Sequence, residues 1–409
     1  MNNRIQIPQG YKDSPLGIIP EEWEVRRLGD IADITSGTTP LRANSKYYND
    51  GIIPWVKTTD LNNGTLYETE EKVSKEAVEK TSLKILPKGT VLVAMYGGFR
   101  QIGRTALLGI EATINQALSA LMCKSSVESS FVLAWLNCQV NYWKRLAASS
   151  RKDPNITGNE VANFPILIPP LEEQERICSV LQLWDSSIEK QSELIEKLKL
   201  RKRALMQQLL TGKKRLPGFS GEWKEVKLGD VFDERNETNR DDLPLLSITG
   251  EKGVIYQSDS DKRDISNDDK TKYKRICPND IGYNTMRMWQ GRSALSELEG
   301  IVSPAYTIVT PRENVNVKFM AILIQQPRVV YDFWTHSQGL VSDTLNCKYP
   351  DFCQVKVRIP TKQEQTAIAS VLVQADKETE LANEKLASLQ SQKRGLMQQL
   401  LTGKKRIII

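Results

Sequence analysis

The strongest constraint on this chain is a stretch that occurs twice. The sequence LMQQLLTGKKR fills positions 205–215 and again positions 396–406, without a single difference. The segments before the two copies are also related, since the Glu-Gln pair at 173–174 recurs as Glu-Gln at 364–365. Self-similarity at a fixed offset indicates that one structural unit is present in two copies.

The two halves also begin alike. EEWEVRRLGDIADI at 21–34 corresponds to GEWKEVKLGDVFDE at 221–234, and 409 residues are more than one ordinary domain needs. The predicted organisation is an N-terminal arm at 1–20, a globular domain at 21–168, a helix at 169–215, a second globular domain at 216–359, and a second helix with the C-terminus at 360–409.

Both helical segments carry apolar residues in alternating steps of four and three, which is the heptad spacing of a coiled coil. Lys202 and Lys393 occupy the same seam position, where a polar residue lowers stability but fixes register. We predict that the two helices, each about 60 Å long at 1.5 Å per residue, form an antiparallel coiled coil. The alternative is two unrelated amphipathic helices, each packing on its own domain. The seam residues are Ile177, Leu181, Trp184, Ile188, Gln191, Ile195, Leu198, Leu205 and Leu209, then Ile368, Leu372, Ala375, Thr379, Ala382, Leu386, Leu389, Leu396 and Leu400.

The ends of these helices are marked by proline and glycine. Pro169-Pro170 and Pro360 suit the start of a helix, and Gly212 and Gly403 suit the left-handed residue that ends one. The helices are therefore expected to begin just after the prolines and to end within the repeated stretch.

The globular segments combine short β-like runs with polar loops. IPWVKTTD at 53–60 parallels LPLLSIT at 243–249, and Gly-Arg-Thr/Ser-Ala occurs at 103–106 and 291–294. The loops between these landmarks differ, which is typical of one scaffold that binds two different targets. The predicted fold class is α+β: two mixed α/β globular domains, separated by two long helices that form an antiparallel coiled coil, in a pseudo-two-fold tandem repeat.

Catalytic motifs are not evident. The loop at 98–105 nearly spells a phosphate-binding P-loop, but Arg104 replaces its lysine and ALLGIEAT after it predicts a strand instead of a helix. His336 is the one histidine, which excludes a His-based metal site or triad in both halves. We expect no cofactor in this chain. Without a CxxC pair, signal peptide or long apolar run, we expect a cytoplasmic protein with reduced thiols and no membrane contact.

The polar loops instead carry side chains suited to nucleic acid. Arg, Lys, Asn and Gln form bidentate bonds to base edges, and Ser, Thr and Tyr bind phosphates. The mild excess of 56 Lys+Arg over 50 Asp+Glu permits an anionic partner without demanding one. The candidate DNA-binding residues are Thr38, Thr39, Arg42, Lys46, Tyr47, Lys57, Tyr96, Arg100, Gln101, Arg104, Ser150, Arg151, Lys152 and Asn155 in the first domain, and Asn284, Arg287, Trp289, Gln290, Arg292, His336, Ser337 and Gln338 in the second.

The whole chain resembles the specificity (S) subunit of type I restriction–modification enzymes. The resemblance rests on YKDSPLGIIPEEWE, SGTTP…YYNDGIIPWVKTTDL, INQALSAL, the PLEEQ and TKQEQ helix starts and the doubled LMQQLLTGKKR. It implies two target-recognition domains, each recognising one half of a bipartite, asymmetric sequence in double-stranded DNA, with the helices setting the spacer.

The resemblance also implies partners that perform the chemistry. Two methyltransferase (M) subunits would bind S-adenosylmethionine and methylate adenine, and restriction (R) subunits, where present, would use ATP and Mg²⁺. The repeated stretch exposes equivalent polar faces to such a pair of partners, so we predict partner-binding roles for Gln207, Gln208, Lys213, Gln398, Gln399 and Lys404. The alternative function is a coiled-coil assembly scaffold that presents two ligand-binding domains without recognising a DNA sequence.

Overall fold

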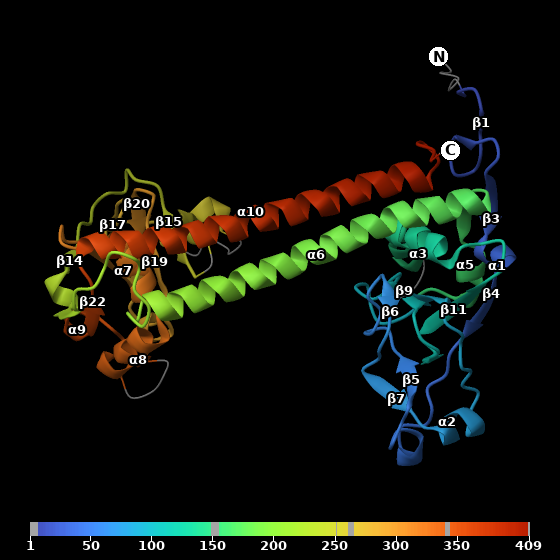
Figure 1. The fold of residues 1–409 in the computed structure, drawn as a ribbon, viewed down its shortest axis with the longest axis horizontal. Helices are drawn as coiled ribbons and strands as arrows, with labels where there is room; N and C mark the ends of the chain where they lie inside the picture. Colours follow the sequence, from blue (N-terminus) through green and yellow to red (C-terminus); the bar gives the residue numbers. More distant parts are fainter. Residues whose placement is uncertain (1–6, 149–154, 251, 261–265, 340–343, 408–409) are drawn as a thin grey trace. The chain divides into compact units, whose positions relative to one another are not determined.

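The computed structural model describes residues 7–148, 155–250, 252–260, 266–339 and 344–407 (Figure 1). The chain divides into two compact units, Met1–Ser192 with Glu384–Ile409, and Glu193–Asn383. Each unit therefore contains one globular domain, the first half of the helix that follows this domain, and the last half of the other helix.

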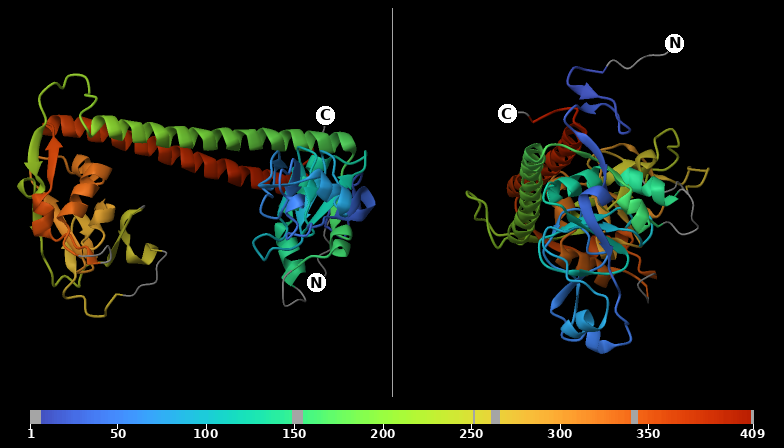
Figure 2. Two further views of the ribbon diagram at one scale, coloured as in Figure 1. Left: turned by 90° about the horizontal axis from the view of Figure 1, so that it is seen from below. Right: turned by 90° about the vertical axis from the view of Figure 1, so that its right-hand side faces the viewer.

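The two long helices are α6 (Leu171–Leu209) and α10 (Lys362–Leu401). They begin after the predicted prolines, and the predicted seam residues are buried or partly buried while most of the remaining side chains are exposed. Figure 2 shows, within each unit, the start of one helix beside the end of the other. The coiled-coil prediction is confirmed, and the alternative of two helices that pack only on their own domains is wrong.

Ion pairs at equivalent positions join the two antiparallel helices in each unit. In the first unit, Lys393 of α10 pairs with Asp185 of α6. In the second unit, Lys202 of α6 pairs with Asp376 of α10. Each seam lysine thus binds an aspartate of the opposite helix, which supplies the partner that a polar seam residue needs.

A second repeated contact joins the end of each helix to the start of the other, and we name these two contacts the helix-end ion pairs. Arg406, the last residue of the second repeat, donates from Nε to Glu173 over 2.7 Å. Arg215, the last residue of the first repeat, donates from Nε and Nη2 to Glu364 over 2.5 and 2.6 Å. Both carboxylates are almost fully buried, with side-chain exposures of 7 % and 1 %.

The glutamines beside these glutamates attach each helix to its own domain. Gln174 accepts a hydrogen bond from the backbone of Glu128 and donates to the carbonyl of Pro169. Gln365 repeats the arrangement with Asn316 and Pro360. The repeated Glu-Gln pair therefore has two tasks, since the glutamate holds the other helix and the glutamine holds the domain.

The leucines and glycine of the repeated stretch complete this junction. Leu400 and Leu401 enter the hydrophobic core of the first domain, and Leu209 and Leu210 enter that of the second. Gly403 has φ +71°, and a Cβ there would lie 2.4 Å from Pro20 Cδ. Only glycine suits this position, because the left-handed conformation and the close proline both exclude a side chain.

The first domain is built on a five-stranded sheet and a three-stranded sheet. The larger sheet has the order β4 (Ala32–Ser36), β11 (Leu118–Cys123), β8 (Val91–Ala94), β9 (Thr105–Leu108) and β6 (Thr65–Leu66). The smaller sheet has the order β10 (Thr113–Ile114), β5 (Ile53–Val56) and β7 (Glu71–Val73). Two further pairs are β12 (Pro165–Ile168) with β3 (Glu24–Arg27), and β1 (Tyr11–Lys12) with β2 (Ile19–Pro20). The short helices are α1 (Leu28–Ile31), α2 (Lys75–Lys80), α3 (Ser129–Cys138), α4 (Val140–Ala148) and α5 (Gly158–Ala162), with a 3₁₀ turn η1 (Ser45–Tyr47).

The second domain repeats this frame with fewer strands. Its main sheet has the order β14 (Phe232–Arg235), β21 (Tyr306–Pro311), β18 (Ile281–Asn284) and β19 (Ser293–Leu295), which matches β4, β11, β8 and β9. The remaining pairs are β13 (Lys224–Lys227) with β22 (Lys356–Ile359), β15 (Leu246–Thr249) with β16 (Gly253–Tyr256), and β17 (Lys274–Ile276) with β20 (Gly300–Val302). The helices are α7 (Val317–Leu323), α8 (Pro327–His336) and α9 (Tyr349–Gln354), with 3₁₀ turns η2 (Leu228–Asp230), η3 (Gln257–Asp259) and η4 (Met288–Gln290).

Candidate nucleic-acid interface

The Gly-Arg-Thr/Ser-Ala motif lies at the start of equivalent strands in the two domains, β9 in the first and β19 in the second. In the first domain the loop joins β8 to β9, and the strand after the motif excludes the helix that a P-loop requires. In the second domain the loop joins β18 to β19 and contains η4. Gly103 and Gly291 have φ of +75° and +73°, so the turn geometry is the same in both copies.

The two arginines of this motif have different surroundings. Arg104 donates to the side chain of Gln101 over 2.9 Å and to the carbonyl of Leu61, so it braces its loop. Arg292 is exposed, and its guanidinium forms no hydrogen bond or ion pair with any residue that the structure describes. The arginine of the Gly-Arg motif therefore stabilises its own loop in the first domain, whereas in the second domain its guanidinium is accessible to a ligand.

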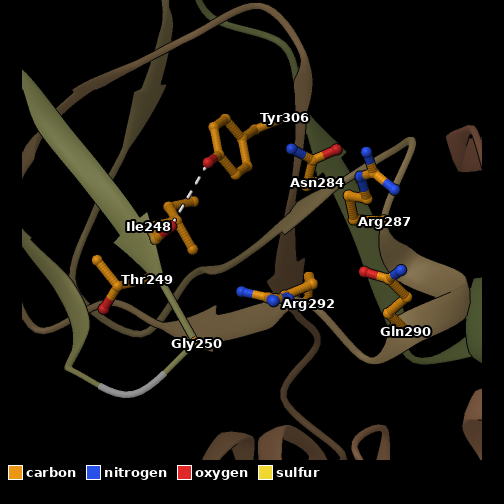
Figure 3. A pocket seen from close by; sticks show the side chains of 8 residues that line it. All are labelled: Ile248, Thr249, Gly250, Asn284, Arg287, Gln290, Arg292 and Tyr306. Carbon is orange, nitrogen blue, oxygen red and sulfur yellow. Dashed lines mark hydrogen bonds between the residues drawn. The ribbon is translucent and has the colours of Figure 1, made fainter. Parts of the chain in front are cut away.

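A polar cavity of about 360 Å³ lies beside Arg292 (Figure 3). The predicted residues Asn284, Arg287, Gln290 and Arg292 line it, so the structure brings four of the eight second-domain candidates together. The remaining lining residues are Ile248, Thr249, Gly250 and Tyr306. None of the eight described lining residues is acidic.

Hydrogen bonds hold the wall of this cavity. Asn284 accepts from the backbone of Met286 over 3.0 Å, and the Tyr306 hydroxyl donates to the carbonyl of Ile248 over 3.4 Å. Burial raises the pKa of the Tyr306 hydroxyl, although the bond with Asn284 and the charge of Arg292 act in the opposite direction. The hydroxyl therefore stays protonated and neutral near pH 7.

Several first-domain candidates are occupied by contacts within the domain. Arg42 and Lys57 both pair with Glu71, over 2.6 and 2.7 Å, and the guanidinium of Arg42 lies 4.6 Å from the ring centre of Tyr48. These bonds, that of Arg42 first, lower the pKa of the Glu71 carboxyl. Thr39 bonds Gln116, so a DNA contact by Arg42, Lys57 or Thr39 would compete with an existing partner.

The remaining candidates are spread over other loops. Lys46 and Tyr47 lie in η1, Trp289 lies in η4 and bonds the carbonyl of Met286, and Gln338 bonds Asp351. Ser150, Arg151 and Lys152 lie outside the described residues. Exposed or partly exposed side chains at the other predicted positions are Thr38, Tyr96, Arg100, Gln101, Asn155, His336 and Ser337. DNA contact by any of these residues stays a prediction.

Two helices carry further exposed polar and aromatic side chains, which the sequence analysis did not predict because its candidates were chosen from loops. On α4, Asn141, Lys144 and Arg145 line a hollow with Phe99, whose side chain is 47 % exposed. On the equivalent helix α8, Tyr331 and Trp334 are exposed and their ring centres lie 5.5 Å apart, and Arg328 is also exposed. Both helices are amphipathic, so a search for polar helix faces beside the Gly-Arg loops would have found these residues.

No cluster of three or more His, Cys, Asp or Glu side chains in the described ranges could hold a metal ion. None of the described helices combines the length and apolar character required to cross a membrane.

Comparison with known proteins identifies the family. The model of the type I restriction modification DNA specificity domain matches twice, at residues 20–200 and 220–391. The chain belongs to this family. The two matches coincide with the two halves of the repeat, each including a globular domain and most of the helix after it.

Curated specificity subunits match either the whole chain or about half of it. The putative type I restriction enzyme MjaX specificity subunit of Methanocaldococcus jannaschii is 24 % identical over 98 % of this chain and 97 % of its own length. The MjaIX specificity subunit of the same organism is 31 % identical, but over 46 % of this chain and 45 % of its own length, so that match spans less than half of each protein.

Solved specificity subunits share the fold. The S subunit of a type I restriction-modification system from M. genitalium gives a TM-score of 0.55 at 14 % identity, covering 97 % of this chain and 98 % of that one. A chain from a study of assembly of a type I R-M system gives 0.61 at 18 % identity, covering 95 % and 99 %. The mixed α/β tandem with two long helices is therefore the specificity-subunit fold.

The partner-binding prediction for this specificity subunit concerns the outer faces of the repeat. Gln207, Gln208 and Lys213 are exposed at the end of α6, and Gln398, Gln399 and Lys404 are exposed at the end of α10. Their accessibility is compatible with a bound subunit, and the role itself stays a prediction.

Proposed function

We propose that this specificity subunit determines where partner subunits act on DNA, in the cytoplasm and without performing chemistry itself. Each globular domain recognises one half of a bipartite, asymmetric site in double-stranded DNA. The helices set the spacer and dock two M subunits, which methylate adenine with S-adenosylmethionine. Where R subunits are present, they bring ATP- and Mg²⁺-dependent restriction to the same site.

One observation carries this proposal. The two domains share a sheet order and the Gly-Arg-Thr/Ser-Ala turn, but the side chains around that turn have different surroundings in the two copies. A common frame with different polar surfaces is the arrangement expected when one scaffold has to recognise two different half-sites. The pairing of the helices in both units supports a fixed spacer, since each helix is held at both ends.

The test is to express the chain with a partner M subunit and to map adenine methylation over a whole genome. We expect methylation at a two-part motif. Replacing residues 216–359 by the same segment of another family member should change one half of the motif and leave the other unchanged. Methylation without a two-part motif, or a motif that survives the exchange unaltered, would contradict the proposal.

Duplex binding separates this function from that of an assembly scaffold. Binding should weaken steeply as salt increases, because protein cations displace the counterions of the phosphates. A scaffold that does not recognise DNA would have no duplex affinity at any salt concentration.

A further inference from the structure

The cavity beside Arg292 is lined by guanidinium groups whose N–H donors have no acceptor among the described residues. Elsewhere in the second domain, Arg235 binds Asp280 and Arg275 binds Glu237 and Glu299. By contrast, the guanidinium groups of Arg287 and Arg292 have no hydrogen bond or ion pair among the described residues. Two exposed guanidinium groups without acids favour a partner that is rich in acceptors.

The internal repeat provides a control for this interpretation. Arg104 occupies the position in the first domain that Arg292 occupies in the second, and it donates hydrogen bonds to the side chain of Gln101 and the carbonyl of Leu61. In the second domain the guanidinium of Arg292 lies beside Gly250, where a Cβ would come within 3.3 Å of Nη1. It makes no hydrogen bond or ion pair among the described residues, so the donors of Arg292 are available.

Neighbouring groups fix the position of the donors. Figure 3 shows the side chains of Arg287, Gln290 and Arg292 around the cavity, with Asn284 and Tyr306 on its wall. Gln290 and Arg287 lie in and beside η4, whose C-cap Gly291 has φ +73° and whose Cβ would meet Val330 of α8 at 3.0 Å. This tight turn against α8 limits the freedom of the residues that carry the donors.

We propose that Arg287 and Arg292 recognise a guanine in the half-site bound by the second domain, an inference that rests on the proposed DNA recognition. Guanine presents two adjacent acceptors, O6 and N7, in the major groove. Two guanidinium groups can divide them, one donating to O6 and the other to N7. Gln290 contributes an amide donor and acceptor for the neighbouring base pair.

A phosphate is the competing ligand, because a guanidinium also binds phosphate oxygens in a bidentate manner. The amide of Gln290 favours a base, since its oxygen needs a donor and an ionised phosphodiester has none. A base-pair edge in the major groove presents donors as well as acceptors. The loss expected on removing a base contact is therefore confined to one position of the site.

The test is selection of duplexes from a random library by the full chain and by its Arg287→Ala and Arg292→Ala variants. Both arginines are exposed and unpaired in the described structure, so the variants should fold, which circular dichroism checks. The wild type should select a two-part motif with a guanine in one half, preferred about 5- to 150-fold over other bases. Each variant should lose most of this preference at that position and keep the other half-site.

Arg203→Ala is the matched control, because Arg203 is an exposed arginine on α6 with no partner among the described residues. It removes the same charge and should leave every motif position unchanged. Equal weakening of all sequences by Arg287→Ala and Arg292→Ala would indicate a phosphate contact and overturn the inference, as would a motif that both variants retain or a lost position that is not guanine. A wild type that selects no two-part motif would instead overturn the proposed function.

Discussion

Replacing Glu173 by Gln should loosen the end of α10 from the first domain. Glu173 is 7 % exposed and accepts from Trp23 Nε1 over 3.0 Å and from Nε and Nη2 of Arg406 over 2.7 and 2.9 Å. Glutamine keeps the shape but removes the charge that both guanidinium bonds need. Removing one partner of a buried pair costs about 3–5 kcal/mol. Arg406 keeps the exposed Glu22, so we expect about 2–3 kcal/mol here.

The assay is amide hydrogen exchange of the peptide that covers residues 396–406. A global free energy of unfolding is poorly defined for a chain with two units, but local opening is measured directly. A loss of about 2–3 kcal/mol makes exchange about 30- to 150-fold faster. Arg406→Gln should produce a similar change, and the double variant should be less affected than the sum of the two.

The neighbouring Glu172 supplies the control. It pairs with Arg176 on the surface of α6 and its side chain is 70 % exposed, so Glu172→Gln should cost less than about 0.5 kcal/mol. If Glu173→Gln accelerated exchange no more than Glu172→Gln, the helix-end ion pair would not hold α10, and the reasoning would be wrong.

Three further predictions concern other parts of the chain. Two cations lower the pKa of Glu71 in the folded state, so the stabilisation is present above its ordinary value of 4.5 and is lost as pH falls. The difference between wild type and Glu71→Gln in the melting temperature of the first unit should therefore shrink from pH 7 to pH 3, and a constant difference would refute it. Gly103→Ala should lower the melting temperature of the first unit more than Gly98→Ala. Both residues have positive φ, but only at Gly103 would the new Cβ meet Trp143, at 2.8 Å, which adds a cost of about 1–3 kcal/mol, and equal effects would contradict this. Replacing Gln207 and Gln398 by Glu should prevent assembly with two M subunits, as mass measurement of the purified complex would record, and full recovery of that complex would count against the predicted docking faces.

The repeat and the helix seam were predictable because they are periodic. A 4-3 spacing sustained over both helices requires an apolar partner surface, and the structure buries the seam residues of α6 and α10 as expected. Gly212 and Gly403 were recognisable as helix ends for a local reason, since few other residues adopt the left-handed conformation, and both have positive φ.

The helix-end ion pairs were not predicted, because each joins residues far apart in the sequence. A terminal arginine in a basic stretch looks like a solvated charge, and Glu173 and Glu364 look like ordinary first-turn residues. The available signal was their joint duplication: an arginine and a glutamate that recur in both halves at equivalent offsets are candidates for one repeated contact.

The candidate interface was predictable in kind but not in detail. Composition indicated donors and acceptors in the loops, yet it could not distinguish Arg104, which bonds its own domain, from Arg292, which lines a cavity. The same pattern in sequence leads to different side-chain partners because the surrounding loops differ. Only three-dimensional contacts separate a bracing residue from an available one.

The most direct test of the central claim is to lengthen both helices together. One heptad inserted after Ser192 and one after Asn383 would keep the seam in phase and add about 10 Å to each helix. Genome-wide methylation by the variant with its M subunit should retain both half-site sequences while the spacer grows by about 3 base pairs, given about 3.4 Å per base pair. An active variant that methylates the original motif with the original spacer would contradict the account, because the helices would then not determine the distance between the half-sites.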